Sequence, residues 1–338
     1  MDSITGKMKH IQYILMVTVI VLLAACSQDV TDEQAQEPDA ALRLAGVTRA
    51  VTGDTEYSDI RVFLTNGTTV TEGLFKYEGE SSSWMTQLKL KSGARTYQLF
   101  GYMPDNAEFV SSISNMNENG AVLHIEQMPP IDTEDFCIVT GVRQADNASD
   151  VTAAVRGAFS FDYDSQQENY INLLLDHLYS HIIFSMRVGD DYNAVRTIKI
   201  KNMKLQVADI SHYNVDVTLT KDVGISSVAH SSVAGTGTQE LTIRDEEITL
   251  TTSSKTVCSG YIIPDATTLF DKLSLVIEYD IYDKRGNKVA VRTATNALAT
   301  PLHELQRGEE RTLQINIDPS YLYDLSLDDP PIVVIRQN

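Results

Sequence analysis

Residues 273–281 are Leu-Ser-Leu-Val-Ile-Glu-Tyr-Asp-Ile, and a large apolar side chain recurs at every second position. Successive side chains of a β-strand point to opposite faces, so this period of two predicts a strand with one buried face. The stripe ends at residues 284–287 (Lys-Arg-Gly-Asn), which are typical of a turn, and apolar residues return at Val289 and Val291. These residues together predict a β-hairpin.

The same alternation recurs along most of the chain. Ile60, Val62 and Leu64 alternate with other residues and lead into Asn66-Gly67, a pair that favours a two-residue hairpin turn. Further strand-like segments are residues 84–90 (WMTQLKL) and 97–100 (YQLF). Helical periodicity is weak, whereas threonine, valine, isoleucine and tyrosine are abundant. The sequence therefore predicts an all-β fold of β-sandwich type.

Two segments depart from this simple pattern. Residues 170–186 (YINLLLDHLYSHIIFSM) are the best helical candidate, but they are too apolar for a surface helix. We expect the second half, residues 181–188, to be a buried strand. Residues 226–239 (SSVAHSSVAGTGTQ) consist mainly of small residues, and we expect a loop there.

The first 26 residues have the pattern of an export signal. Lys7 and Lys9 precede an uncharged apolar run over residues 11–23, which is shorter than the roughly 20 residues that a membrane-spanning helix needs. The run ends in Leu-Ala-Ala followed by Cys26, the pattern of a bacterial lipoprotein signal. This pattern predicts that residues 1–25 are removed and that Cys26 carries fatty acyl chains such as palmitate.

Length and charge limit the remaining possibilities. The 338 residues suggest two folded domains, and the formal net charge of −19 argues against nucleic acid as a partner. The expected organisation is a signal peptide (1–25), an acidic tether (26–41), an N-terminal β-sandwich domain (42–168) and a C-terminal β-sandwich domain (169–338). Beyond Cys26, only Cys137 and Cys258 remain, and we expect both to be buried and unpaired.

Motifs of catalysis and cofactor binding are missing from the sequence. His303-Glu304 begins a zinc-protease pattern, but Arg307 stands where the second histidine is needed. His177 and His181, placed in one strand, would lie about 13 Å apart, so we expect packing or surface roles for them. Asp318, with the acidic residues near 324–329, is compatible with calcium or, more simply, with a solvated turn. The sequence predicts no enzymatic activity, no cofactor and no metal site.

Several segments, taken in order, resemble the fimbrillin family, which contains the pilin subunits and accessory proteins of type V pili in Bacteroidetes. The segments are the lipoprotein signal ending at Cys26, residues 47–50 (VTRA), 97–104 (YQLFGYMP), 175–184 (LDHLYSHIIF) and 312–323 (TLQINIDPSYLY). The resemblance implies two transthyretin-like β-sandwich domains in an outer-membrane lipoprotein exposed at the cell surface. It implies a structural subunit of a fimbria that serves adhesion.

The resemblance also implies a mechanism of assembly. An arginine-specific surface protease cuts after the first strand, and a C-terminal strand of the next subunit fills the groove that is left. Carried onto this chain, the leading cleavage site is the bond between Arg49 and Ala50. The bond between Arg43 and Leu44 is the second choice, and we expect Arg61 to lie inside a strand. The alternative is that Arg49 is an ordinary surface residue that is never cut.

The donor strand would come from the end of the chain. Leu313, Ile315 and Ile317 alternate as a donor strand requires, and Ile332 and Val334 do so in a second segment after Pro330-Pro331. The alternative is that both segments complete the second domain. The chain would then be an anchor or a tip subunit.

The expected partners are other fimbrial subunits, the arginine-specific protease, the outer membrane through the lipid, and a glycan or protein receptor on a host or another bacterium. A glycan-binding surface lipoprotein outside a pilus is the alternative function. Such proteins usually display exposed aromatic side chains, whereas the single tryptophan here, Trp84, lies in an alternating strand where packing in the core is expected. A secreted hydrolase is a minor third class, disfavoured by the missing motifs.

Overall fold

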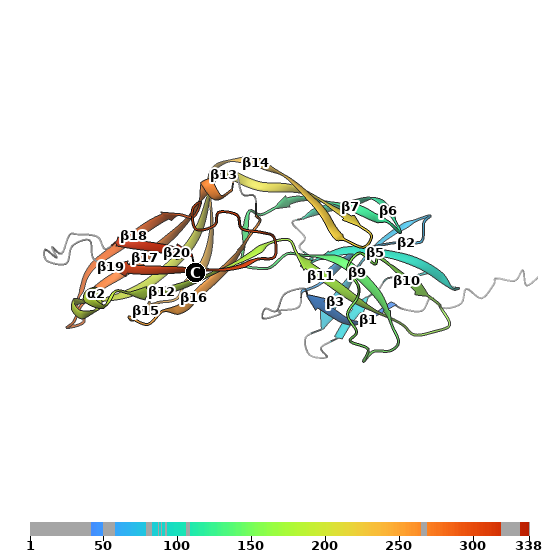
Figure 1. Ribbon diagram of the computed structural model, residues 1–338, viewed down its shortest axis with the longest axis horizontal. Coiled ribbons are helices and arrows are strands. Elements are labelled where there is room, and N and C mark those ends of the chain that lie inside the picture. The colour runs from blue at the N-terminus through green and yellow to red at the C-terminus, as the bar shows by residue number, and fades with distance from the viewer. Residues whose placement is uncertain are drawn as a thin grey trace, which may run out of the picture. The chain divides into compact units, whose positions relative to one another are not determined.

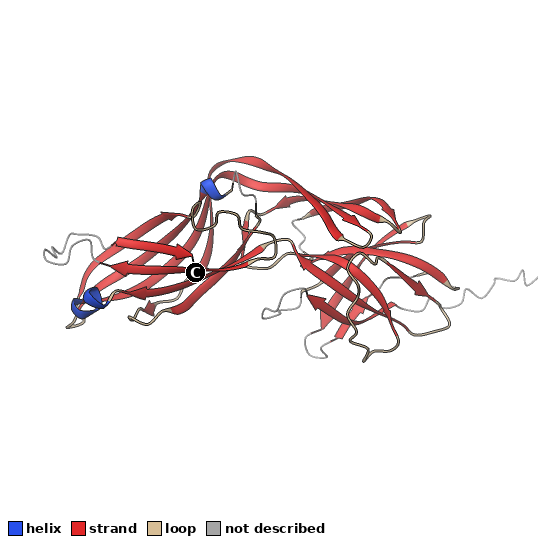
Figure 2. Ribbon diagram, in the orientation of Figure 1, coloured by secondary structure: helices blue, strands red, loops and turns tan. Residues whose placement is uncertain are grey.

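The computed structural model describes residues 42–49, 58–78, 83–86, 88, 90–91, 93–105, 109–264, 269–318 and 332–337. The predicted signal peptide and tether, with Cys26, lie outside the described residues, and so does Ala50. Strands account for nearly all the regular structure of the described residues, joined by α2 (Asp190–Val195) and the short helix η1 (Phe270–Lys272) (Figure 2). The predicted all-β sandwich fold is confirmed. No helix among the described residues has the length and apolar character needed to cross a membrane.

An eight-stranded sheet has the strand order β10-β5-β2-β3-β4-β1-β11-β9 (Figure 1). Its strands are β1 (Leu42–Arg49), β2 (Ile60–Thr65), β3 (Val70–Glu78), β4 (Ser83–Thr86), β5 (Arg95–Met103), β9 (Cys137–Ala145), β10 (Ser160–Tyr163) and β11 (Asn169–His177). Because β5 also pairs with β9, the sheet closes on itself and forms a ring from β5 through β1 and back to β5. Closure leaves the ring strands with hydrogen-bonding neighbours on both sides.

The alternation of side chains in β2 decides what fills this ring. Ile60, Val62 and Leu64 are fully buried in a hydrophobic cluster enclosed by the eight-stranded sheet, whereas Phe63 points to a second cluster on the other face. The hairpin predicted after β2 is confirmed, although Thr65 pairs with Val70 and the loop therefore has four residues rather than two. Gly67, at φ +87°, supplies the left-handed conformation of that loop.

Two further sheets are formed by the other strands. A five-stranded sheet has the order β20-β19-β12-β16-β8, and a seven-stranded sheet has the order β18-β17-β13-β7-β6, with β14 and β15 also paired to β13. Their strands are β6 (Val110–Asn117), β7 (Gly120–Met128), β8 (Ile131–Asp132), β12 (Ser180–Val188), β13 (Arg196–Thr220), β14 (Gly224–Arg244), β15 (Ile248–Thr249), β16 (Lys255–Ile262), β17 (Leu273–Asp283), β18 (Lys288–Ala297), β19 (Glu310–Asp318) and β20 (Ile332–Gln337).

The strand β13 spans 25 residues and organises the seven-stranded sheet. Its first part, residues 196–207, pairs with β17, and its last part, residues 213–220, pairs with β7. The hairpin predicted from residues 273–291 is confirmed as β17 and β18. The loop predicted at residues 226–239 is wrong, because this segment is the middle of β14 and pairs with β13 along its length. Backbone pairing decides the structure there, since most of its small side chains are exposed.

The helical candidate at residues 170–186 is two strands. Its second half is β12, as predicted, and its first half belongs to β11, with a bend at Leu178 and Tyr179 between them. β11 pairs with β1 and β9, which precede the predicted domain boundary at residue 168, whereas β7 pairs with β13, which follows it. The division of the chain at that residue stays a prediction.

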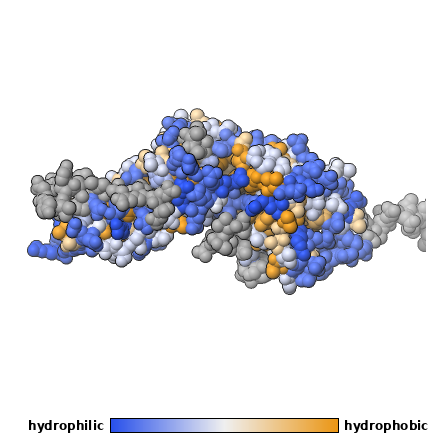
Figure 3. Space-filling view, viewed as in Figure 1, coloured by the Kyte–Doolittle hydropathy of each residue, from blue (hydrophilic) through white to orange (hydrophobic). Residues whose placement is uncertain are grey.

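One hydrophobic cluster joins buried side chains of the five-stranded and seven-stranded sheets. It contains Phe184 and Leu313 from the first of these sheets and Val217 and Ile277 from the second. Phe100, on the outer face of the eight-stranded sheet, belongs to the same cluster. On the surface, hydrophilic residues cover most of the described part of the face drawn in Figure 3, with smaller hydrophobic patches between them.

This packing predicts unequal effects for one substitution at two positions of the seven-stranded sheet. Val217 is fully buried, and removing two of its carbons should lower the free energy of unfolding by about 2 kcal/mol. Val291 is 60% exposed, so Val291→Ala should change it by less than about 0.5 kcal/mol. Urea denaturation of Val217→Ala and Val291→Ala measures the difference, and equal effects would contradict the assignment of the core.

Candidate functional site

The first described strand, β1, fills a place between β4 and β11 in the eight-stranded ring. It runs parallel to β11, with Leu42 opposite Asn169 and Arg49 opposite Leu175. Among the described residues, its ladder with β4 consists of one residue pair, Leu44 opposite Trp84. β1 is therefore held mainly by one neighbouring strand.

The side chains of β1 divide between the inside and the outside of the ring. Leu42 and Leu44 are 1% and 7% exposed and belong to the enclosed hydrophobic cluster. Arg43 points outward, where Nη1 donates to the hydroxyl of Tyr170 at 3.0 Å and lies 3.5 Å from the carboxylate of Glu168. A register shift between Leu44 and Gly46 interrupts the alternation. The buried side chains of β1 are thus Leu42 and Leu44, near its start.

The structure distinguishes the arginines considered as cleavage sites. Arg49 is the last residue of β1, and Ala50 lies outside the described residues. Arg43 lies inside β1 and is followed by the buried Leu44, which shields that bond. Arg61 lies in β2, as predicted. Its guanidinium donates to Asp105 at 2.6 Å and also pairs with Glu72, and these contacts raise the pKa of Arg61.

The two candidate donor segments have different surroundings. Leu313, Ile315 and Ile317 lie in β19, where they are buried in the large hydrophobic cluster. β19 is an internal strand, parallel to β12 on one side and antiparallel to β20 on the other. Ile332 and Val334 lie in β20, opposite Asp318 and Asn316. β20 is at the edge of the five-stranded sheet.

Trp84 packs inside the molecule, as predicted. It is partly buried, packs against the enclosed cluster, and its ring centroid lies 5.0 Å from that of Tyr77 on the neighbouring strand. A cross-strand aromatic pair of this kind stabilises a sheet. This position gives Trp84 a packing role in place of the stacking platform that a glycan-binding surface needs.

The two cysteines considered for a disulfide, Cys137 and Cys258, do not form one. Cys137 is fully buried, as predicted, whereas Cys258 in β16 is only partly buried. Burial raises the pKa of the Cys258 thiol to about 12, and its sulfur lies 3.6 Å from that of Met203. The two thiols lie in different sheets.

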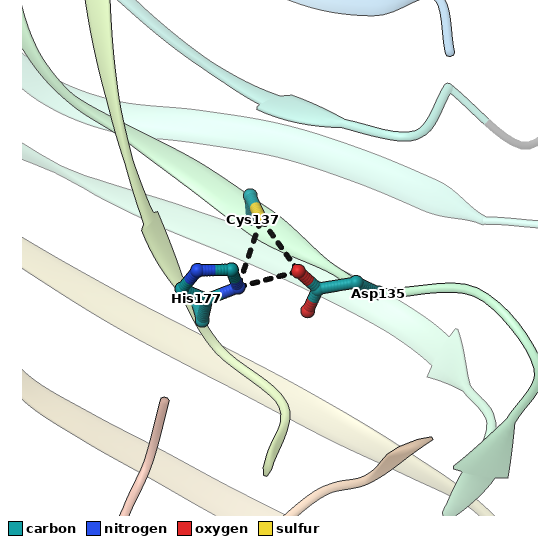
Figure 4. A group of neighbouring side chains, drawn as sticks. All are labelled: Asp135, Cys137 and His177. Atoms are coloured by element: carbon teal, nitrogen blue, oxygen red, sulfur yellow. Dashed lines mark hydrogen bonds and ion pairs between the residues drawn. The ribbon is translucent and has the colours of Figure 1, made fainter. Parts of the chain in front are cut away.

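Asp135, Cys137 and His177 form a polar cluster that the sequence analysis did not anticipate (Figure 4). The Cys137 sulfur lies 3.2 Å from Asp135 Oδ2 and 3.6 Å from His177 Nδ1, and Nδ1 also contacts Asp135 Oδ2. A Cys-His-Asp triad needs the thiol and the carboxylate on different ring nitrogens. Here both are on Nδ1, and Cys137 is fully buried, so the cluster lacks the geometry of a nucleophilic triad.

The placement of the two histidines differs from the expectation of a single strand. His177 ends β11, whereas His181 lies in β12 of another sheet, stacked on Tyr261 at 4.7 Å. His181 also contacts Glu310 at 3.1 Å. His177 additionally lines a surface cleft of about 420 Å³ whose walls include Arg156.

The comparisons with known proteins concern the fold. No family model matches the sequence, and no curated protein matches it. A fimbrial protein from Bacteroides vulgatus is similar in structure at 12% identity and a TM-score of 0.44, over 88% of this chain and 98% of that one. A candidate cell adhesion protein from Bacteroides uniformis has 10% identity and a TM-score of 0.40, over 88% and 96%. A candidate polysaccharide-binding protein from Bacteroides thetaiotaomicron has 8% identity and a TM-score of 0.35, over 82% and 92%.

The raised pKa of Cys258 predicts its chemical reactivity. The thiolate is the reactive form, and with a pKa of about 12 its population should grow about tenfold per pH unit between pH 7 and pH 10. Alkylation of the native chain by iodoacetamide, followed by peptide mass spectrometry, measures the rate at Cys258. The urea-unfolded chain is the control, and there the rate should level off near pH 9. A native rate that levels off at the same pH would contradict the effect of burial.

Proposed function

We propose that this chain is a structural subunit of a cell-surface fimbria of the type V kind, assembled by protease-triggered strand exchange and serving adhesion. The observation that carries the proposal is the position of β1. A single strand, the first of the fold, fills a place in an otherwise continuous ring and ends at Arg49.

Removing β1 would create an acceptor groove. The edge of β11 would lose the partners of residues 169–175, and the ring would lose the buried side chains of Leu42 and Leu44. Burying a leucine side chain is worth about 1.5–3 kcal/mol, and an open strand edge is prone to pairing with another chain. Both effects favour refilling of the groove by a strand from a second subunit.

The donor strand is better supplied by β20 than by β19. Withdrawing β19 would break pairing on two sides and remove Leu313, Ile315 and Ile317 from the hydrophobic cluster of their own chain. Withdrawing β20 breaks the pairing with β19 on one side. In the sequence of β20, the apolar residues Ile332 and Val334 stand two positions apart, as the alternation of a donor strand requires.

Head-to-tail transfer of β20 into the groove of the next copy does not close on itself, so it generates a filament. In this proposal Cys26 carries the lipid, residues 26–41 are the tether, and an arginine-specific surface protease releases β1 from an outer-membrane lipoprotein. The partners are other fimbrial subunits and, through adhesion, a glycan or protein receptor. No catalytic residue, cofactor or nucleic acid takes part.

The proposed cleavage predicts a single new N-terminus. A chain that begins at residue 27, treated with a limiting amount of trypsin, should give detergent-resistant polymers on unboiled gels whose first residue is Ala50. Arg49→Gln should abolish the polymers, because the only bond that releases β1 is lost. Arg43→Gln is the matched control and should polymerise like the parent chain. Polymers from Arg49→Gln, or a stable cleaved monomer from the parent, would contradict this part of the proposal.

The proposed donor predicts a chain terminator. Deletion of residues 332–338 should leave a folded monomer that trypsin still cuts but that forms no polymers alone. Mixed with the parent chain before cleavage, it should shorten the polymers, because it accepts a strand and donates none. Circular dichroism of the deletion variant checks its fold. A polymer ladder of unchanged length would assign the donor to another segment, and absence of any ladder from the parent would favour an anchor or tip subunit.

A further inference from the structure

We propose that Asp135, Cys137 and His177 bind one divalent transition-metal ion, and that Zn²⁺ is the ion that suits them best. The proposal rests on the geometry of these three side chains and is independent of the proposed fimbrial function. The site is distinct from β1 and from β20, the two strands that the assembly model uses.

Elementary sheet geometry brings the three side chains together. Cys137 and His177 are Cα partners at the last position of the β9–β11 ladder, so their side chains lie on the same face of the sheet. Asp135 precedes Cys137 by two residues along an extended segment and lies on that face too. His177 continues the inward stripe of Leu173 and Leu175 in β11. The cluster therefore lies next to the enclosed hydrophobic cluster, to which Cys137 itself belongs.

The donor atoms converge on one region of space. One ligand atom from each residue lies within 4.8 Å of the others. With Zn–S near 2.3 Å and Zn–N near 2.05 Å, tetrahedral coordination requires a sulfur–nitrogen distance of about 3.6 Å. The distance from Cys137 Sγ to His177 Nδ1 is 3.6 Å. The Cys137 Sγ to Asp135 Oδ2 distance is 3.2 Å, shorter than the corresponding sulfur–oxygen distance of about 3.6 Å.

The two contacts that must lengthen for an ion to enter both involve Asp135 Oδ2, one to Cys137 Sγ and one to His177 Nδ1. Asp135 Oδ2 and His177 Nδ1 are in direct contact, and coordination needs them about 3.4 Å apart. Asp135 lies before the first residue of β9, outside the ladder whose last pair is Cys137 and His177. The other ring nitrogen of His177, Nε2, is buried and makes no hydrogen bond among the described residues, so every polar contact of the ring is at Nδ1.

The chemistry of the donors selects the ion. Sulfur, nitrogen and carboxylate oxygen together are the ligand set of Zn²⁺, whereas Ca²⁺ and Mg²⁺ take oxygen ligands alone. A thiolate and a carboxylate balance the two positive charges of the ion, which matters at a site where the Cys137 side chain is fully buried and the Asp135 side chain is 7% exposed. A water molecule completes the tetrahedron, and His177 stands beside the surface cleft of about 420 Å³.

Such an ion would join the start of β9 to the end of β11. It would add a covalent-like link at the end of a ladder whose last pair is Cys137 and His177. Binding to the folded chain alone raises its stability by mass action, so the melting temperature should rise with the concentration of free zinc. The role that we infer is structural.

Cobalt provides a direct test. The full-length chain, purified in detergent without a histidine tag and stripped with a chelator, is titrated with Co²⁺ and then with Zn²⁺. We expect a thiolate-to-cobalt absorption band that saturates at one ion per chain, and its displacement by Zn²⁺ with a rise in melting temperature. Absence of a saturable band in the folded parent chain would overturn the proposal without any variant.

The matched variants assign the ligands. Cys137→Ser and His177→Gln should each weaken binding by more than about 100-fold, since a ligand contributes more than its supporting residues do. Cys258→Ser and His181→Gln replace the same residue types outside the cluster and should bind like the parent. Circular dichroism confirms the fold of each variant. Equal binding by the Cys137→Ser variant, or loss of binding in Cys258→Ser, would place the ion elsewhere and overturn the proposal.

Discussion

The parallel pairing of β1 with β11 is the interaction on which the eight-stranded sheet depends. Because β9 pairs with β5, the strands of the ring have no open edge while every one of them is present, and β10 remains outside the ring as an edge strand. β1 is the ring member joined most weakly to one of its neighbours, because its described ladder with β4 consists of one residue pair. The strand that completes the ring is also the one that ends at Arg49, and for this reason we propose β1 as the strand that is removed.

The arrangement of the seven-stranded sheet follows from the length of β13. One strand of 25 residues cannot be covered by a single neighbour, so β17 covers its first part and β7 its last part. β14 follows the opposite edge. β13 therefore has neighbouring strands along most of each edge, and its pairing with β14 explains how β14 remains a strand although few of its side chains are buried.

Local sequence patterns predicted those strands that bury one apolar face. The apolar pattern of Leu273, Leu275 and Ile277 predicted β17, because a buried stripe with period two fits a strand and does not fit a helix. The small residues of β14 carry no such stripe, and its pairing partner lies outside the segment, so the sequence suggested a loop. The cluster of Asp135, Cys137 and His177 could not be predicted from the sequence for the same reason. Asp135 and Cys137 are two residues apart, but His177 joins them only through the register of β9 with β11, which no local pattern specifies.

The strand β11, which contributes His177 to the polar cluster, is also the strand with which β1 pairs. β11 is paired on both sides, with β1 over residues 169–175 and with β9 over residues 170–177. Among the described strands, loss of β1 would leave β9 as the one hydrogen-bonding neighbour of β11. In our proposal, an ion held by Cys137 and His177 would fix the end of that ladder, where fraying would otherwise begin, and would so keep the edge of β11 in place. The metal site and the acceptor groove would then lie on opposite edges of one strand, the first preserving the shape that the second requires.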